Sequence, residues 1–350
     1  MKKIIKYLAG GIAVAIVLFI GFLACATLSD FQPEEKIELL KSKEGYPIKE
    51  QTFTIMSWNI GYAGLGDNMD FFYDGGTKVR DTKERTIQNL NQILEFISSQ
   101  HNIDFYLLQE VDVHAKRSYY INERDSIEKR MPNYLSLYTD NYMVKFVPVP
   151  ILEPMGYVQA GLQFLTKKVP VESNRYAFPG NYSWPTSLFM LDRCFMANRY
   201  KLDNGKELII INTHNSAFDD GSLKQQQLEY LKIFLEAEYE KGNYFVVGGD
   251  WNQNPPQMNT SQFGDYADSE NFQLSMIDES IFPSDWQWVY DANTATNRSN
   301  VSPYIKGETS TSILDFFLIS PNIKANFITT IDLEFKNSDH QPVIMNFELQ

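Results

Sequence analysis

Apolar residues recur along the chain with two spacings, one typical of helices and the other typical of buried strands. Residues 82–99, TKERTIQNLNQILEFISS, place leucine and isoleucine every three or four positions, which predicts an amphipathic helix. The run that follows, IDFYLLQEVD, is short and apolar, and it predicts a strand that ends at Glu110. A helix followed by a strand with an acid at its end is therefore expected here.

The same order recurs in the second half of the chain. Residues 222–242, SLKQQQLEYLKIFLEAEYEKG, predict a second amphipathic helix, and YFVVGGD then predicts a buried strand that ends at Asp250. Between these units the chain alternates strand-like and helix-like segments without a clear linker. The pattern predicts one α/β domain with two similar halves that face each other across one site.

The first 28 residues have a different pattern. Lys2, Lys3 and Lys6 precede an uncharged run over residues 7–28, long enough to span a bilayer as a helix. Because positive charges tend to stay in the cytoplasm, we predict a cell-membrane anchor with an extracytoplasmic domain behind it. Two alternatives fit the same residues: a cleaved signal peptide, which gives a secreted protein, and a lipoprotein signal with its lipid on Cys25.

The remaining chain divides into two parts. Residues 29–50 are polar and predict a tether with at most one helical turn, and residues 51–350 form the predicted domain. A net charge of −13 disfavours non-specific nucleic-acid binding, which depends on basic residues. With only two cysteines, no disulfide framework is expected. No sequence feature indicates a protein partner.

Polar side chains accumulate at the ends of the apolar runs. Strand ends at one edge of a sheet meet in space, so these residues are expected to form one site. They are Asn59, Glu110, His214, Asn215, Asp250, Asn252, Asp315, Asp339 and His340.

This residue set suits hydrolysis of phosphoesters with a hard divalent cation. Glu110, Asp339 and Asn59 offer the oxygen ligands that Mg²⁺ prefers, and Mn²⁺ accepts the same ligands. Asp250 or His340 would align the attacking water. The chain has no G-x-x-x-x-G-K-[ST], HExxH or G-x-S-x-G motif, so it is not expected to be a P-loop motor, a zincin protease or a serine hydrolase.

Six segments in order resemble the motif series of the endonuclease/exonuclease/phosphatase superfamily, which includes nucleases, sphingomyelinases and inositol phosphatases. The segments are SWNIG, LLQEVD, INTHNSAFD, GGDWNQ, ILDFFLIS and NSDHQPV. The resemblance implies a four-layer α/β sandwich, with two central mixed sheets flanked by helices. The sequence departs from the apurinic endonucleases at Gly61, where they carry an acid, and it lacks the inositol phosphatases' signature before ILDF.

The resemblance also implies roles for the residues. Metal is expected on Glu110, Asn59 and Asp339. Water activation, phosphate contact and phosphoryl stabilisation are expected from five residues, namely Asp250, Asn252, His340, His214 and Asp315, the last of which orients the His340 ring.

Residues outside the motifs are expected to select the substrate. Asn215, Lys116 and Arg117 are predicted to bind it, and Arg193 is a weaker candidate. The aromatic segments GNYSWPTSLF and FPSDWQWVYDA form either a substrate wall or core. The expected function is an outward-facing phosphodiesterase on a lipid head group or small molecule. A nuclease, a phosphomonoesterase and an inactive binding domain are the alternatives.

Overall fold

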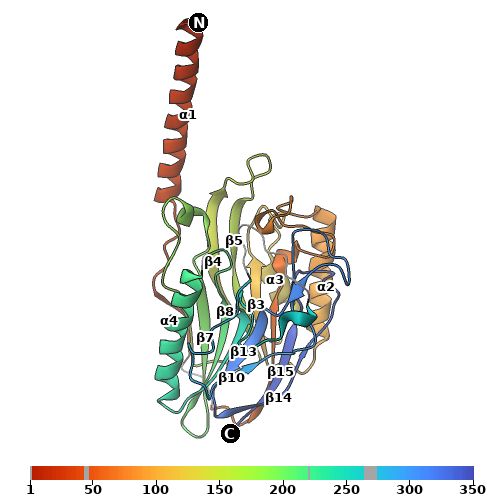
Figure 1. Cartoon of the computed structure of the whole chain (residues 1–350). Coiled ribbons are helices and arrows are strands. Elements are labelled where there is room, and N and C mark those ends of the chain that lie inside the picture. Colours follow the sequence, from red (N-terminus) through yellow and green to blue (C-terminus); the bar gives the residue numbers. More distant parts are fainter. Residues whose placement is uncertain (1, 43–46, 220, 264–273) are drawn as a thin grey trace.

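Two β-sheets face each other at the centre of the molecule, and helices cover their outer faces (Figure 1). The structure is a computed structural model that describes residues 2–42, 47–219, 221–263 and 274–350. The helices are α1 (Lys2–Leu28), α2 (Lys83–Ser99), α3 (Glu123–Arg130) and α4 (Ser222–Tyr239). Short 3-10 helices are η1 (Gly61–Ala63), η2 (Phe72–Asp74), η3 (Thr186–Phe189) and η4 (Thr260–Gln262).

The first sheet has seven strands, in the order β1 (Lys36–Lys41), β6 (Glu172–Ala177), β7 (Cys194–Lys201), β8 (Glu207–His214), β9 (Tyr244–Asp250), β13 (Asp315–Ile319) and β10 (Gln287–Val289). The second has six, in the order β14 (Ile323–Thr330), β15 (Val343–Leu349), β2 (Thr52–Asn59), β3 (Phe105–Asp112), β5 (Gly156–Thr166) and β4 (Leu135–Val147). A small ribbon pairs β11 (Asn297–Arg298) with β12 (Thr311–Ser312).

Three layers of apolar side chains hold the sheets and helices together. The inner layer joins the two sheets and includes Leu107 of β3 and Val246 of β9, both fully buried. A second layer packs α4 on the first sheet through Leu231, and a third packs α2 on the other sheet through Ile93. The predicted four-layer α/β sandwich is confirmed.

The two-half pattern also appears in the strand pairing. β2 runs parallel to β3, and α2 connects them; β8 runs parallel to β9, and α4 connects them. Two parallel strands joined by a helix end at the same edge of their sheet. Glu110 and Asp250 therefore reach equivalent positions in the two facing sheets.

Two glycines let β9 run between its neighbours. A Cβ on Gly248 would lie 2.4 Å from the Phe317 ring, and one on Gly249 would lie 1.9 Å from the Thr213 carbonyl oxygen. Gly249 also has φ +150°, which residues with a side chain rarely adopt. The pair brings the next residue, Asp250, to the end of a closely packed core strand.

Part of the segment expected to be a tether, residues 29–50, is a strand. Residues 36–41 form β1, which pairs antiparallel with β6 at the edge of the first sheet. Leu39 and Leu40 pack against the inner core, so this strand gains apolar burial that a solvated tether would not have. Residues 43–46 of the expected tether lie outside the described residues.

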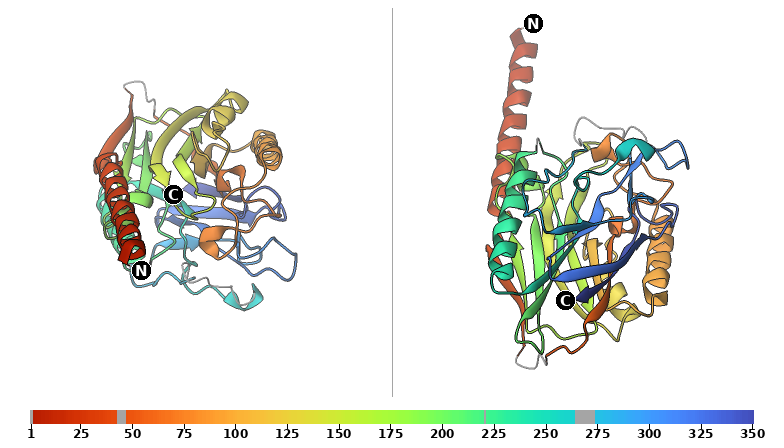
Figure 2. Two further views of the ribbon diagram at one scale, coloured as in Figure 1. Left: turned by 90° about the horizontal axis from the view of Figure 1, so that it is seen from above. Right: turned by 60° about the horizontal axis from the view of Figure 1, so that its bottom comes forward.

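Helix α1 extends away from the rest of the molecule (Figures 1 and 2). It has 27 residues, and an 18-residue stretch of it has a mean hydropathy of 2.6, so it is long and apolar enough to cross a membrane. A signal sequence meets the same criteria. The expected N-terminal hydrophobic helix is present, and its last turns contact the domain where Phe22 stacks on Phe189, with ring centroids 5.8 Å apart.

Candidate active site

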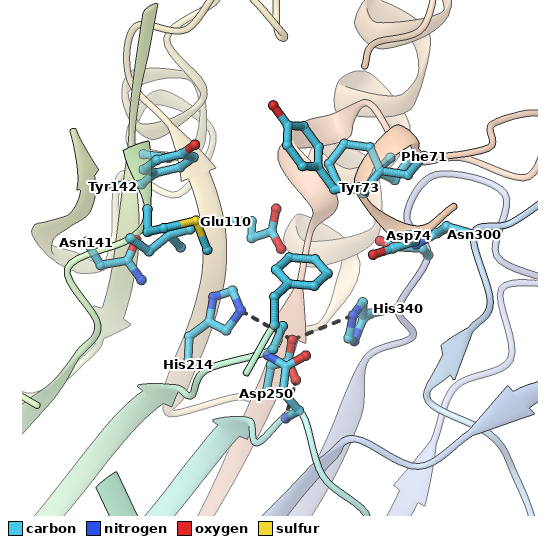
Figure 3. Close-up of a pocket in the computed structure, with 18 of the residues that line it drawn as sticks. Phe71, Tyr73, Asp74, Glu110, Asn141, Tyr142, His214, Asp250, Asn300 and His340 are labelled. Carbon is cyan, nitrogen blue, oxygen red and sulfur yellow. Dashed lines mark hydrogen bonds and ion pairs between the residues drawn. The ribbon is translucent and has the colours of Figure 1, made fainter. Parts of the chain in front are cut away.

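One cavity opens at the edge of the sheets where the predicted site residues meet (Figure 3). Its floor carries titratable side chains, namely Asp74, Glu110, His214, Asp250, Asp339 and His340. Its walls are largely apolar, and they include Phe71, Tyr73, Tyr142, Met155, Phe189 and Phe218. The cavity thus combines a charged floor with an apolar rim.

Asp250 lies at the centre of this floor. Its Oδ2 is 3.5 Å from Nε2 of His214, 3.6 Å from Nε2 of His340, and accepts a hydrogen bond from Asn59 at 3.0 Å (Figure 3). The backbone N–H of Asn252 donates to the other carboxylate oxygen at 2.9 Å. Burial raises the Asp250 pKa to about 6, although the neighbouring His340 acts to lower it.

His340 is held by Asp315, as the sequence predicts. Its Nδ1 lies 2.7 Å from Asp315 Oδ2, and its Nε2 lies 3.0 Å from the side-chain amide of Asn297. Burial acts to lower the His340 pKa, but Asp315 and Asp250 outweigh it and hold the pKa well above its usual value. These two carboxylates therefore favour the protonated form of the His340 ring.

The surroundings of His214, unlike those of His340, favour the neutral ring. Its burial, and then the positive charge of Arg193, hold the pKa of the ring well below its usual value. Its Nδ1 is buried and has no hydrogen-bond partner among the described residues, whereas Nε2 faces Asp250. A neutral imidazole with Nε2 protonated would donate toward Asp250 and toward a substrate oxygen beside it.

Three carboxylates gather on the other side of the floor. Asn300 links two of them, because its amide donates to Asp74 at 3.0 Å and to Asp339 at 2.6 Å. Burial raises the pKa of Glu110, and the charge of Asp339 raises it further. Burial also raises the pKa of Asp74 to about 7. The protein thus concentrates negative charge here at a cost in free energy.

The backbone at Glu110 aims its side chain into the cavity. Glu110 has φ +52°, and the pairing of β3 with β5 shifts register between Leu108 and Val111. Such a bulge re-aims a side chain beside a functional site. Arg117 also lines the cavity, 3.8 Å from Glu110, but most of its hydrogen-bonding capacity goes to Asp112, at 2.9 to 3.3 Å.

Asn59 bridges the two groups of acids. Its amide nitrogen donates to Glu110 at 3.2 Å and to Asp250 at 3.0 Å, and its oxygen accepts from the N–H of Gly61. Direct binding of a metal by Asn59 stays a prediction, because the side-chain oxygen of Asn59 already accepts the hydrogen bond from Gly61. A Cβ on Gly61 would lie 2.8 Å from Asp339 Oδ1. Glycine at this position, where the apurinic endonucleases carry an acid, therefore leaves room for the Asp339 carboxylate.

The residues present fit a hard divalent cation. Glu110, Asp339 and Asp74 offer only oxygen, and Mg²⁺ and Mn²⁺ prefer oxygen ligands. Among the described residues, Asp250, Asp315 and His340 also hold ligand atoms within 4.8 Å of one another. That second group suits a metal less well, because a protonated His340 cannot be a ligand.

Two predicted substrate-binding residues do not line the cavity. The ammonium of Lys116 donates to the Pro154 carbonyl at 2.8 Å, and its side chain lies outside the cavity. The side chain of Asn215 bonds Thr213, and its carbonyl accepts from Asn252 at 3.0 Å. Asn215 therefore orients Asn252, which does line the cavity, as Arg193 also does.

Sequence reasoning missed Asp74, Asn297 and Asn300, because none of them follows a long apolar run. Asp74 ends the short helix η2, Asn297 begins the two-residue strand β11, and Asn300 lies in the loop after it. Arg298 is fully buried and donates to three carbonyls of the Gly-rich loop, those of Leu65, Gly66 and Met69. These bonds fix the loop that carries Asp74. The run DFFYD in that loop, three aromatic residues between two acids, is the feature of the sequence that could have indicated Asp74.

The two aromatic segments have different roles. In the first, Phe189 lines the cavity and Trp184 is exposed. In the second, Trp286 and Trp288 pack in the outer core around Phe282. The first segment is thus partly wall, and the second is core.

Comparisons with known proteins agree with this geometry. A model of the endonuclease/exonuclease/phosphatase family matches residues 56–340. No curated protein matches the chain closely enough to count as a relative.

Three solved structures share the fold. A family member from Beutenbergia cavernae is 15% identical, with a TM-score of 0.58 over 86% of this chain and 72% of that one. D. rerio TDP2, in complex with a single-strand DNA product, is 13% identical, with a TM-score of 0.54 over 85% and 100%. The human Nocturnin catalytic domain, with a bound sulfate anion, is 17% identical, with a TM-score of 0.51 over 87% and 97%. Since the family model spans most of the sequence, the chain belongs to the endonuclease/exonuclease/phosphatase family.

Proposed function

We propose that the protein is a divalent-metal-dependent hydrolase of phosphoester bonds that acts on a lipid head group or a small phosphodiester. The observation that supports this most directly is the arrangement on the cavity floor, where Asp250 Oδ2 lies 3.5 Å from Nε2 of His214 and 3.6 Å from Nε2 of His340. Burial raises the Asp250 pKa to about 6, and the neighbouring carboxylates hold the His340 pKa well above its usual value, which favours a proton acceptor beside a proton donor. A base and an acid side by side are what hydrolysis of an ester requires.

The proposed step assigns each proton. Asp250 accepts a proton from water as the water oxygen bonds to phosphorus. The bond from phosphorus to the leaving alcohol oxygen breaks, and His340 donates a proton to that oxygen. His214 and Asn252 line the cavity beside Asp250 and donate to the phosphoryl oxygens, where negative charge increases.

The metal belongs beside this group. Glu110 and Asp339, with Asp74, would hold Mg²⁺ or Mn²⁺, which supplies positive charge to a phosphoryl oxygen when bound. Asn59 would fix the positions of the Glu110 and Asp250 carboxylates relative to each other, because its amide donates a hydrogen bond to each of them.

Helix α1 is proposed to be an uncleaved anchor with the domain outside the cytoplasm. Three lysines precede its apolar run, and the positive-inside tendency keeps them in the cytoplasm. The segment between α1 and β1 covers only residues 29–35, so an anchored domain would stay against the bilayer. A cleaved signal peptide or a lipidated Cys25 would give a secreted or lipid-anchored protein instead.

A lipid or small phosphodiester is favoured over nucleic acid for two reasons. The net charge of −13 gives little counterion release on a polynucleotide, and the cavity rim is aromatic and apolar. The nuclease alternative has support in one structural neighbour, D. rerio TDP2, which is complexed with a single-strand DNA product. Lys116 and Arg117 do not form a basic groove for a polynucleotide, because the side chains of both make hydrogen bonds within the protein.

An inactive binding domain is the alternative of another class. A site that has lost its chemistry should carry substitutions among the acids and histidines. Here Glu110, Asp250, Asp339, His214 and His340 are all present and converge on one cavity. The enzyme is therefore the preferred proposal.

A substrate screen tests these proposals. The purified full chain in mild detergent is incubated with Mg²⁺ and plasmid DNA, RNA, sphingomyelin, phosphoinositides or sugar phosphates. Release of a head group or a phosphorylated head group supports the favoured function, and nicking of plasmid alone supports the nuclease. Failure on every class, with substrate still bound, supports the binding domain. An Asp250→Asn preparation controls for contaminating hydrolases.

A further inference from the structure

Exposed apolar side chains gather at the tip of the hairpin that joins β4 to β5. Leu152 is 100% exposed and Ile151 is 87% exposed, and Val149 beside them is exposed as well. Water solvates such side chains poorly, and a tip of this kind in a soluble domain gains nothing from them. The hairpin tip, residues 149–152, therefore needs an apolar partner.

The base of α1 lies beside this hairpin. Phe22 of α1 packs edge-on against Phe146 of β4, with centroids 6.3 Å apart, and stacks on Phe189. Trp184, which is exposed, donates from Nε1 to the Thr27 hydroxyl at 3.2 Å. In Figure 1 the hairpin rises at the end of the molecule from which α1 leaves. A bilayer crossed by α1 would thus face the hairpin tip.

The rim of the catalytic cavity is bonded to the hairpin. The Tyr73 hydroxyl donates to the Val149 carbonyl at 2.7 Å, and the Met155 N–H donates to that carbonyl at 3.2 Å. The Tyr142 hydroxyl donates to the Phe189 carbonyl at 3.1 Å. Tyr73, Tyr142, Met155 and Phe189 all line the cavity, so its rim is continuous with both the hairpin and the base of α1.

Basic side chains flank the stem of the hairpin, although the chain is acidic overall. Lys116 bonds the Pro154 carbonyl, and Lys145 lies over the Tyr157 ring. Arg80 pairs with Glu153 next to the tip at 3.2 Å. Apolar residues at a tip with cations behind them match the order of apolar core and anionic head groups in a membrane leaflet.

We infer that the hairpin tip inserts into the leaflet beside α1 and holds the cavity mouth against the bilayer. The substrate class that follows is a membrane lipid, whose phosphoester enters the cavity while its apolar chains stay against the aromatic rim. This inference rests on the proposed hydrolase and the proposed anchor. Lys116 is then a residue of the membrane-facing stem and not a ligand of the scissile phosphate.

The insertion is tested without any activity measurement. Full chain with Cys25→Ser and Leu152→Cys is labelled with an environment-sensitive fluorophore and reconstituted into vesicles of phosphatidylcholine and phosphatidylglycerol. The native Cys194 is buried and does not compete for the label. Brominated acyl chains should quench the probe at 152 at least about threefold more than a probe at Ile233→Cys, which is exposed and apolar but lies on α4, the helix packed on the outer face of the first sheet. Equal quenching at the two positions would overturn the inference.

Lipid access is tested by a second pair of variants. Ile151→Ser with Leu152→Ser should lower hydrolysis of vesicle lipid about tenfold or more, because two apolar side chains no longer hold the mouth at the leaflet. Hydrolysis of soluble bis(p-nitrophenyl) phosphate should stay unchanged, as it should in the matched control Ile233→Ser with either substrate. Unchanged lipid hydrolysis, or an equal loss on both substrates, would overturn the lipid-access inference. If the wild-type chain cleaves neither substrate, the proposed function fails, and the quenching experiment still decides the insertion.

Discussion

Asp250 lies at the centre of the cavity floor, with two histidines and one asparagine around a single carboxylate oxygen. Asp250→Asn keeps the shape of the side chain and removes its charge. Because the acceptor for the water proton is lost, we expect kcat to fall at least about a hundredfold. The variant should remain folded, which its thermal unfolding checks. A normal kcat would reduce Asp250 to a turn residue at the end of β9.

The pKa of Asp250 gives the expected pH dependence. Burial raises it to about 6, and the base must be ionised to act. Activity should therefore be low below about pH 5 and increase with pH through about 6. His340, whose pKa is held well above its usual value, should stay protonated and active through neutral pH. A kcat profile that is flat from pH 5 to 8, with chemistry rate-limiting, would contradict the role of Asp250, and a fall in kcat between pH 6 and 7 would contradict that of His340.

Lys116 and Arg117 are adjacent in sequence but differ in environment. Arg117 is buried, bonds the fully buried Asp112 and stacks on Tyr62, 3.8 Å from its ring centroid. Arg117→Ala leaves Asp112 charged and unpaired, so we expect a loss of about 3–5 kcal/mol in unfolding free energy. Lys116→Ala should leave stability within about 0.5 kcal/mol. Urea titrations of both variants test this contrast, and equal losses would contradict it.

At the level of elements, an ion-pair cluster fastens the end of α4 to the first sheet. Burial acts to raise the pKa of Glu238, but bonds from Arg199, Lys241 and Asn243 outweigh it and lower the pKa to about 2. A depressed carboxyl pKa stabilises the fold above the unfolded value near 4.5, and that contribution disappears as pH falls toward about 2.

Glu238→Gln should therefore destabilise the protein by roughly 1–3 kcal/mol at pH 7, and the difference should shrink to near zero by about pH 2. Urea unfolding at a series of pH values measures it. Glu236→Gln is the matched control, because its pairing with Lys232 is more exposed and should contribute less than about 0.5 kcal/mol. A difference that does not depend on pH would show that Glu238 acts through packing alone.

The sequence predicts those elements whose apolar period is strong. Both helix and strand units are found where the period places them. Strand β9 ends at Asp250 as expected, whereas β3 continues two residues beyond Glu110 to Asp112. Strand β1 escaped prediction because its six residues, KIELLK, are mixed in polarity and gain stability only by pairing with β6, far along the chain. Edge strands of this kind carry little local signal.

Loop residues of the site escaped prediction for a related reason. Asp74 reaches the cavity because Arg298 fixes the Gly-rich loop and Asn300 bonds the carboxylate, and both come from more than 200 residues away. No local pattern encodes such contacts. Lys116 shows the converse error, since a basic residue after the metal-binding strand resembles a phosphate ligand until its bond to Pro154 is seen.

At the scale of the whole molecule, the fold connects the charged floor, the apolar rim, the hairpin and the base of α1 through direct contacts. In Figure 1 the hairpin and α1 both lie at the upper end of the molecule. The two facing sheets supply the floor from strand ends, and the connecting loops supply the rim. The proposed anchor and the proposed chemistry are thus joined by side chains that belong to both. Phe189 is the clearest case, because it lines the cavity and stacks on Phe22.

The central claim is that this cavity hydrolyses phosphoesters with a divalent cation held by oxygen ligands. The most direct measurement is hydrolysis of bis(p-nitrophenyl) phosphate or vesicle lipid by the full chain, first untreated, then with EDTA, then after dialysis into Mg²⁺ or Mn²⁺. The account predicts that EDTA abolishes the activity, that either cation restores it, and that Asp250→Asn stays at least about a hundredfold slower throughout. Full activity in the metal-stripped wild-type protein would contradict the account.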